Sequence, residues 1–117
     1  MSRRTARVED LLRAEISDLI LREVQDPRVR LATVSAVSVS PDLRHATVSV
    51  SVLGEDEKRE ETVQALHHAR GFIRSQLAHR LRLRVVPDLV FQLDRGAEYS
   101  QRITDLLEKL NDDHEGA

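Results

Sequence analysis

The segment 46–53 constrains the fold most, because valines alternate strictly in it with small hydroxyl residues. A period of two residues is typical of a β-strand that buries one face. A second β-rich run lies at 31–40, and turn residues separate the two runs, Ser40-Pro41-Asp42-Leu43-Arg44-His45. The two runs are therefore predicted to pair as an antiparallel hairpin.

Apolar residues at helical spacing predict helices before and after this hairpin. The first helix is expected from Thr5, as its cap, to about Val24, because Asp26-Pro27-Arg28 then ends it. Further periodic segments predict three more helices and one more strand, namely helices at 57–69, 72–83 and 99–110 and a strand at 89–94.

The chain of 117 residues is expected to form one α+β domain over residues 1–110, followed by a disordered acidic tail at 111–117. The order of elements predicts a three-stranded sheet with helices on one face and leaves the strand order open. No apolar run approaches the ~20 residues that span a bilayer. The chain has no cysteine, which fits a reducing compartment, and the cytoplasm is the expected location.

Positive charge is gathered in residues 67–84, although the chain as a whole carries a net charge of -2. This stretch contains three histidines, no carboxylate and five arginines, Arg70, Arg74, Arg80, Arg82 and Arg84. The arginines fall largely between the apolar positions, so a helix here presents guanidinium groups to solvent. Either the stretch binds a partner, or it is an ordinary solvated helix face. Three more arginines near the N-terminus are read either as a basic arm for phosphate or as a solubilising terminus, Arg3, Arg4 and Arg7.

Gly71 interrupts the same stretch inside a helical pattern. Glycine in a helix interior costs roughly 1 kcal/mol relative to alanine, so it usually has a packing or bending reason. Ala69-Arg70-Gly71 is therefore interpreted as a kink or tight turn where another backbone approaches closely. On that interpretation, Gly71→Leu is predicted to clash and to lose stability. The alternative is a plain helix with a tolerated glycine.

The sequence shows no motif for catalysis or for binding a metal or cofactor. Its four glycines are too dispersed for a phosphate loop, and without cysteine it has no thiolate ligand or nucleophile. His67, His68 and His79 do not share one helix face. The chain is therefore not expected to be an enzyme, and nucleic-acid binding becomes the leading class. Phe72 and the other two aromatics are expected to be buried or half-buried, which argues against a sheet that stacks bases.

The αββααβ order with a glycine between two helices resembles the type II KH arrangement, which clamps a short nucleic-acid backbone. The usual Gly-x-x-Gly is absent, and Ala69-Arg70-Gly71 stands in its place. This Ala-x-Gly kink resembles the ribosome-binding factor A family. The other matching segments follow in family order, namely Asp26-Pro27-Arg28-Val29, Val37-Ser38-Val39-Ser40-Pro41-Asp42-Leu43, Ala46-Thr47-Val48, Gly71-Phe72-Ile73-Arg74, Leu83-Arg84-Val85-Val86-Pro87-Asp88-Leu89-Val90-Phe91 and Asp94.

The resemblance implies an assembly factor that binds the immature 30S small ribosomal subunit near the 5′ region of its 16S rRNA. Such a factor supports late maturation and precursor processing, matters most in the cold and performs no chemistry. Ribosomal proteins and other maturation factors are further expected partners, and the chain is expected to be a monomer.

By analogy with the family, the five clustered arginines contact phosphates, Gly71 sets the angle between the helices, and the N-terminal arginines extend the footprint. Reversing Arg74 and Arg80 together is predicted to abolish binding and to leave the fold intact. The alternative from another class is a protein-binding adaptor that presents the same arginine face to an acidic partner.

Overall fold

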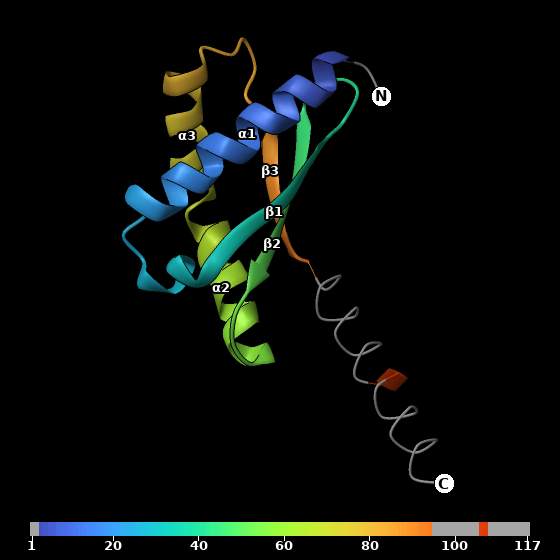
Figure 1. Ribbon diagram of the computed structural model, residues 1–117. Coiled ribbons are helices and arrows are strands. Elements are labelled where there is room, and N and C mark those ends of the chain that lie inside the picture. Colours follow the sequence, from blue (N-terminus) through green and yellow to red (C-terminus); the bar gives the residue numbers. More distant parts are fainter. Residues whose placement is uncertain (1–2, 95–105, 108–117) are drawn as a thin grey trace, which may run out of the picture.

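The computed structural model describes residues 3–94 and 106–107. Its elements follow in the order α1 (Arg3–Arg22), η1 (Pro27–Leu31), β1 (Ala32–Val39), β2 (His45–Val52), α2 (Asp56–His68), α3 (Arg70–Leu81) and β3 (Asp88–Leu93) (Figure 1). The predicted α+β class is confirmed. The helix expected at 99–110 and the tail expected at 111–117 lie outside the described residues, except for positions 106 and 107.

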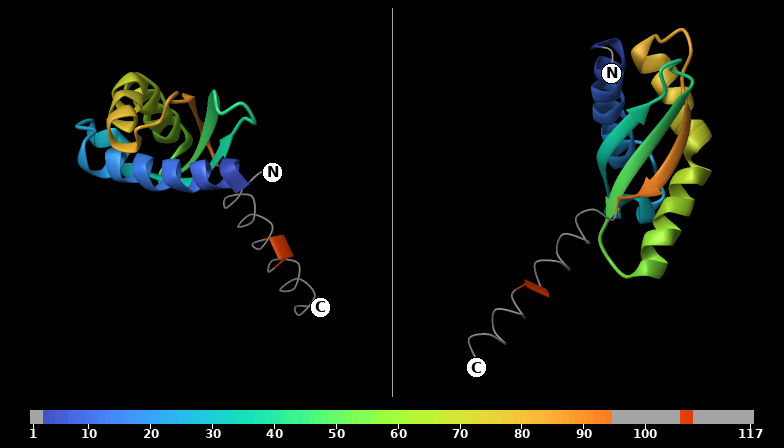
Figure 2. Two further views of the ribbon diagram at one scale, coloured as in Figure 1. Left: turned by 90° about the horizontal axis from the view of Figure 1, so that it is seen from above. Right: turned by 90° about the vertical axis from the view of Figure 1, so that its right-hand side faces the viewer.

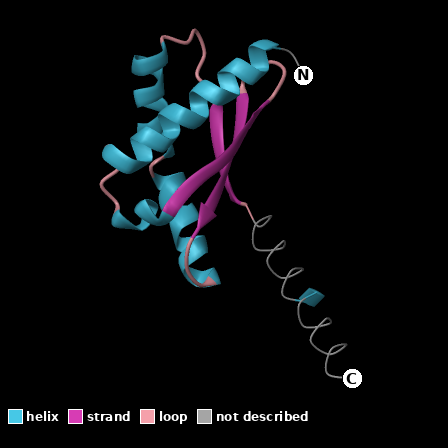
Figure 3. Ribbon diagram, viewed as in Figure 1, coloured by secondary structure: helices cyan, strands magenta, loops and turns pink. Residues whose placement is uncertain are grey.

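The three strands form one sheet in the order β1-β2-β3 (Figure 3). β1 and β2 pair antiparallel, as the alternation and the turn residues predicted. β3 pairs parallel with β2, from His45 opposite Asp88 to Val50 opposite Leu93, so α2 and α3 form the connection between two parallel neighbours. A bulge lies between Val34 and Ala36 of β1.

The helices cover one face of the sheet, as predicted (Figure 2). On β2 the even-numbered residues from Ala46 to Val52 are buried, and the hydroxyl residues between them are only half-buried. Helical residues that close the core from the other side are Leu12, Ile16, Leu19, Leu66, Ile73 and Leu77, each 0% exposed. This packing fixes α2 and α3 beside β3. None of the described helices is long and apolar enough to cross a membrane.

The first helix begins and ends two residues earlier than predicted. Thr5 lies inside α1, which already begins at Arg3, so it is not the cap. At the other end, Asp26 starts a new element, because its side chain accepts a hydrogen bond from the Arg28 N–H at 3.0 Å and Pro27 supplies a helical first position. The Asp26-Pro27-Arg28 segment therefore begins the 3-10 helix η1 as well as following α1.

The break between α2 and α3 is present, and it lies at Ala69. This residue has φ -84° and ψ -3° and is the single residue between the two helices. Gly71 is the second residue of α3, and a Cβ there would meet no heavy atom within 4 Å apart from its chain neighbours and the backbone of its own helix. The expected close approach of another backbone, and the clash in Gly71→Leu, are therefore wrong. The reason is that this position faces open space and not α2.

Candidate nucleic-acid interface

Two hollows meet at the start of α3, and both are lined by Gly71 and Arg74. The first has a volume of about 710 Å³ and lies between the α2–α3 junction and β3, with Arg70 and His68 on its wall. The second has a volume of about 520 Å³ and follows α3 toward the loop before β3, with Arg84 on its wall. The bare backbone of Gly71 therefore lies between two recesses, each with arginine on its wall.

The charge around the hollows is mostly positive. Arg70 and Arg84 are exposed, and neither residue takes part in an ion pair within residues 3–94. Among the described residues that line the two hollows, Asp88 is the only acid. Because arginine presents a planar fork of donors, this arrangement suits phosphate oxygens.

Arg74 is shared between the fold and the surface. Its Nη2 and Nε donate to the Val86 carbonyl at 3.0 and 3.4 Å, and its Nη1 lies 3.3 Å from the Asp88 carboxylate. Its side chain nevertheless stays 46% exposed, so part of the guanidinium remains accessible from both hollows. Arg74 thus fixes the loop before β3 and also contributes charge to the site.

Arg80 is committed to the protein itself. Its guanidinium lies 2.8 Å from Asp18, 3.1 Å from Glu15 and 3.7 Å from Glu23, all on or just after α1. The hydrogen bonds to Asp18 and Glu15 raise the pKa of Arg80, and the hydrogen bond from Arg80 lowers the pKa of Asp18. These contacts argue against the prediction that reversing Arg74 and Arg80 together leaves the fold intact, because a glutamate at position 80 faces three acids.

The remaining arginines of the expected site lie outside the hollows. Arg82 is the C-cap of α3, exposed, in the left-handed region with φ 49°. Arg3, Arg4 and Arg7 form the exposed first turns of α1 and line neither hollow. The fold therefore gathers Arg70, Arg74 and Arg84 around Gly71 and leaves the other arginines apart.

His67 lines the larger hollow, and no pattern in the sequence indicated its role there. Its Nε2 accepts a hydrogen bond from the Phe91 N–H of β3 at 3.1 Å, and the two rings meet edge to face with centroids 5.7 Å apart. Burial, followed by the charges of Arg70 and His68, lowers the pKa of His67. The neutral imidazole therefore holds β3 against the wall of the larger hollow.

The hollows lack the features of a base-stacking or metal site. No Phe, Tyr or Trp is among the described residues that line them. Phe72 is 44% exposed on α3, so the expectation that it is buried or half-buried is wrong. Within the described part of the chain, no group of three His, Cys, Asp or Glu side chains is placed to hold a metal ion.

Residues 4–107 match the protein family described as ribosome-binding factor A. A relative of that name from Halothermothrix orenii is 44% identical over 112 residues, which cover 96% of this chain and 92% of the relative. The chain belongs to the ribosome-binding factor A family.

Solved structures of the family have the same architecture. The crystal structure of ribosome-binding factor A from Thermus thermophilus matches with a TM-score of 0.70 and 33% identity, over 79% of this chain and 98% of that one. A homology model of the Thermus thermophilus protein, fitted into a cryo-electron microscopy map of a 30S–RbfA complex, matches with a TM-score of 0.55 and 34% identity. That match covers 73% of this chain and 93% of the other.

Proposed function

We propose that this chain binds the immature 30S small ribosomal subunit and supports late maturation and processing of its 16S rRNA, without catalysing a reaction. Membership of the ribosome-binding factor A family supports the proposal, and so does the relative placed in a map of a 30S complex. The chain is proposed to act as a monomer in the cytoplasm, near the 5′ region of the rRNA, with the largest effect in the cold.

The observation that carries the proposed site is the cluster of exposed arginines around the bare backbone of Gly71. A side chain at position 71 would point into open space, so glycine keeps this surface low enough for a ribose-phosphate backbone to come close. Arg70, Arg74 and Arg84 surround that point and offer donors for phosphate. Because none of the described residues that line the hollows is aromatic, recognition depends on the shape of the folded RNA and not on stacked bases.

The experiment is co-sedimentation of the full chain with purified immature small subunits at several salt concentrations. We expect Arg70→Glu combined with Arg84→Glu to lower the affinity about tenfold or more and to reduce the salt dependence by about one ion per lost phosphate contact. The matched control is Arg22→Glu combined with Lys58→Glu, which makes the same charge change away from the hollows. Equal affinities of the two double variants would place the interface elsewhere.

Two further measurements separate the function from its alternative. The adaptor interpretation replaces RNA binding if the chain stays bound to a ribosomal protein after nuclease digestion of the rRNA, and if Arg70→Glu combined with Arg84→Glu abolishes that binding. In a strain that lacks the chain, we expect 16S precursors to accumulate, more so in the cold. The wild-type chain and the control variant should restore processing, whereas the Arg70/Arg84 double variant should not.

A further inference from the structure

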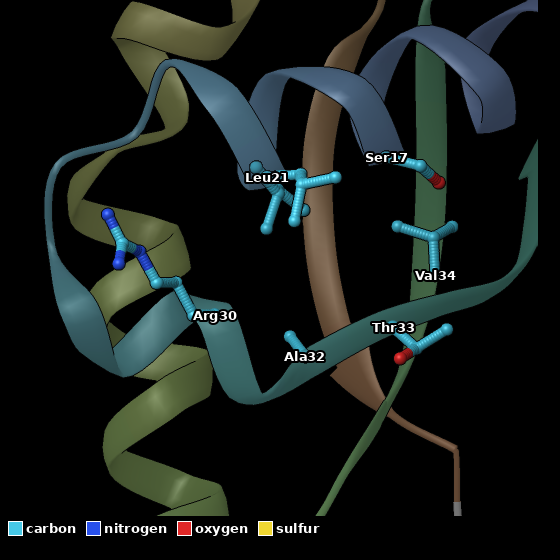
Figure 4. Close-up of a pocket in the computed structure, with 7 residues that line it drawn as sticks. Ser17, Leu21, Arg30, Ala32, Thr33 and Val34 are labelled. Carbon is cyan, nitrogen blue, oxygen red and sulfur yellow. The ribbon is translucent and has the colours of Figure 1, made fainter.

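The outer edge of β1 carries a groove that the proposed rRNA interface does not use. β1 is an edge strand, and no described strand pairs with its outer side. Two hollows, of about 180 and 210 Å³, follow this edge between β1 and α1. Figure 4 shows the first hollow, with Leu21 and Ser17 of α1 above Ala32 and Val34 of β1.

The backbone of β1 points into this groove at alternate residues. The Val39 N–H donates to the Glu9 carboxylate of α1 at 3.3 Å, so the backbone groups of Val39 face α1 and not β2. Val37 lies two residues away and faces the same direction. Val34 also faces this way despite the bulge. Its partner on β2 is Val50, which is two residues from Val48, the partner of Val37. The edge therefore offers the outward main-chain groups of Val34 and Val37 to an added strand, whereas the Val39 N–H is already bonded to Glu9.

The opposite edge of the sheet is closed. There the Phe91 N–H of β3 donates to the His67 imidazole, and α2 packs along the strand. An open strand edge is a template for another extended chain, which gains main-chain hydrogen bonds and places alternate side chains in pockets. On β1 this template is formed by Val34 and Val37, because Glu9 already accepts the outward N–H of Val39.

The two ends of the groove differ in charge. Glu9 and Asp10 line one end together with Arg13, and Arg30 lines the other. Between them, Ile20, Leu21 and Val34 give the 180 Å³ hollow an apolar wall. The residues that line the groove include two carboxylates and two arginines, so the groove has no excess of positive charge to attract a nucleic acid.

We propose that this groove binds an extended protein segment, which adds a fourth strand beside β1. A basic side chain of the segment pairs with Glu9 and Asp10, an aliphatic side chain fills the hollow beside Leu21, and an acidic side chain pairs with Arg30. That the segment belongs to a protein of the small subunit rests on the function proposed above. A second copy of β1 fits less well, because the bulge breaks the regular spacing that two such strands need to pair along their length.

The test is site-specific photocrosslinking of the full chain on purified small subunits. A photoreactive amino acid replaces Thr33, an exposed residue on the wall of the groove, and in a control protein it replaces Gln64, an exposed residue of α2. We expect position 33 to crosslink to one mapped segment of a ribosomal protein, with little crosslinking of that segment from position 64. Crosslinks from position 33 only to rRNA, to a second copy or to residues 95–117 of the same chain would overturn the proposal, as would none at all.

Co-sedimentation measured on the same samples separates the two proposals. A chain that binds subunits without a protein crosslink at position 33 refutes the added strand alone. A chain that does not bind subunits refutes the proposed function. It then also refutes the proposal that a protein of the small subunit supplies the added strand. The two failures are therefore distinguishable.

Variants of the groove sharpen the result. Asp10→Lys and Ser17→Phe, the second of which fills the hollow, should each lower the crosslinking yield about fivefold or more if the segment contributes about 1 kcal/mol at each point. Glu60→Lys on α2 makes the same charge change as Asp10→Lys outside the groove and should leave the yield unchanged. Because Asp10→Lys adds positive charge, a lower yield in that variant is not explained by weaker attraction to rRNA.

Discussion

Replacing His67 tests how the wall of the larger hollow is held. Its imidazole accepts a hydrogen bond from the Phe91 N–H at 3.1 Å, and it also packs edge to face on the Phe91 ring. His67→Phe keeps an aromatic ring and removes the acceptor. His67→Gln keeps an acceptor of similar reach and removes the ring, so the two variants separate the contributions.

The structure sets the expected size of each effect. The hydrogen bond is partly buried, and leaving such an N–H without a partner costs about 1–3 kcal/mol. The lost ring pair costs about 0.5–1.5 kcal/mol. We therefore expect His67→Phe to lower the free energy of unfolding more than His67→Gln does, with the larger loss concentrated at β3.

The sign of the pH dependence follows from the lowered pKa of His67. The unfolded chain, with an ordinary histidine pKa of 6.5, takes up a proton more readily than the folded chain. The stabilising contribution is therefore complete above pH 6.5 and is lost as the pH falls below it and through the lower folded pKa. Glutamine does not titrate, so the gap in unfolding free energy between wild type and His67→Gln should narrow as the pH falls.

The assay is urea unfolding of the three proteins at about pH 8 and about pH 5, with hydrogen exchange of the Phe91 amide at the higher pH. Fast exchange of that amide is expected in His67→Phe and slow exchange in His67→Gln. The reasoning is refuted if the phenylalanine variant is as stable as the glutamine variant. A gap between wild type and His67→Gln that does not change with pH would refute the assigned direction of the pKa.

Three further outcomes are expected. Hydrogen bonds from the Arg28 side chain and N–H lower the pKa of Asp26 from the ordinary 3.8 to about 2. The stabilising contribution of Asp26 is therefore lost as the pH falls from 3.8 through 2. Asp26→Asn should make the stability measured by urea unfolding less sensitive to acid. Gly71→Ala should keep or raise the free energy of unfolding, by up to about 1 kcal/mol, and should lower the affinity for small subunits, whereas lower stability would contradict the open surface. Arg80→Gln should unfold at a lower urea concentration, with a smaller difference in high salt, and should co-sediment like wild type wherever it is folded.

Local patterns were sufficient to predict most of the elements. The alternation in 46–53 predicted a strand with one buried face, because burial on one side repeats every second residue. The apolar periodicity on each side of Ala69 likewise predicted two helices, and the glycine at position 71 predicted the interruption between them. Gly71 was misread because a glycine in a helical pattern indicates either a close contact or an open surface, and only the packing of α3 separates the two.

Contacts between distant segments could not be predicted in this way. The parallel pairing of β3 with β2 places His45 opposite Asp88, and no local pattern specifies that register. For the same reason the sequence did not indicate that Arg80 is paired, because its acidic partners Glu15 and Asp18 lie more than 60 residues earlier in the chain. Charge counted along the sequence therefore overestimated the basic surface, since the fold pairs Arg80 with three acids and Arg74 with Asp88.

The late arrival of β3 has a consequence for synthesis of the chain. β2 is the central strand of the sheet. One of its edges pairs with β3 (Asp88–Leu93), which is translated only after α2 and α3. Until then a nascent chain can complete the hairpin, but it exposes a row of unpaired amides and carbonyls on a valine-rich strand. A chain whose translation stops before Asp88 should therefore aggregate. In the finished chain, β3 prevents this because it pairs with the exposed edge of β2.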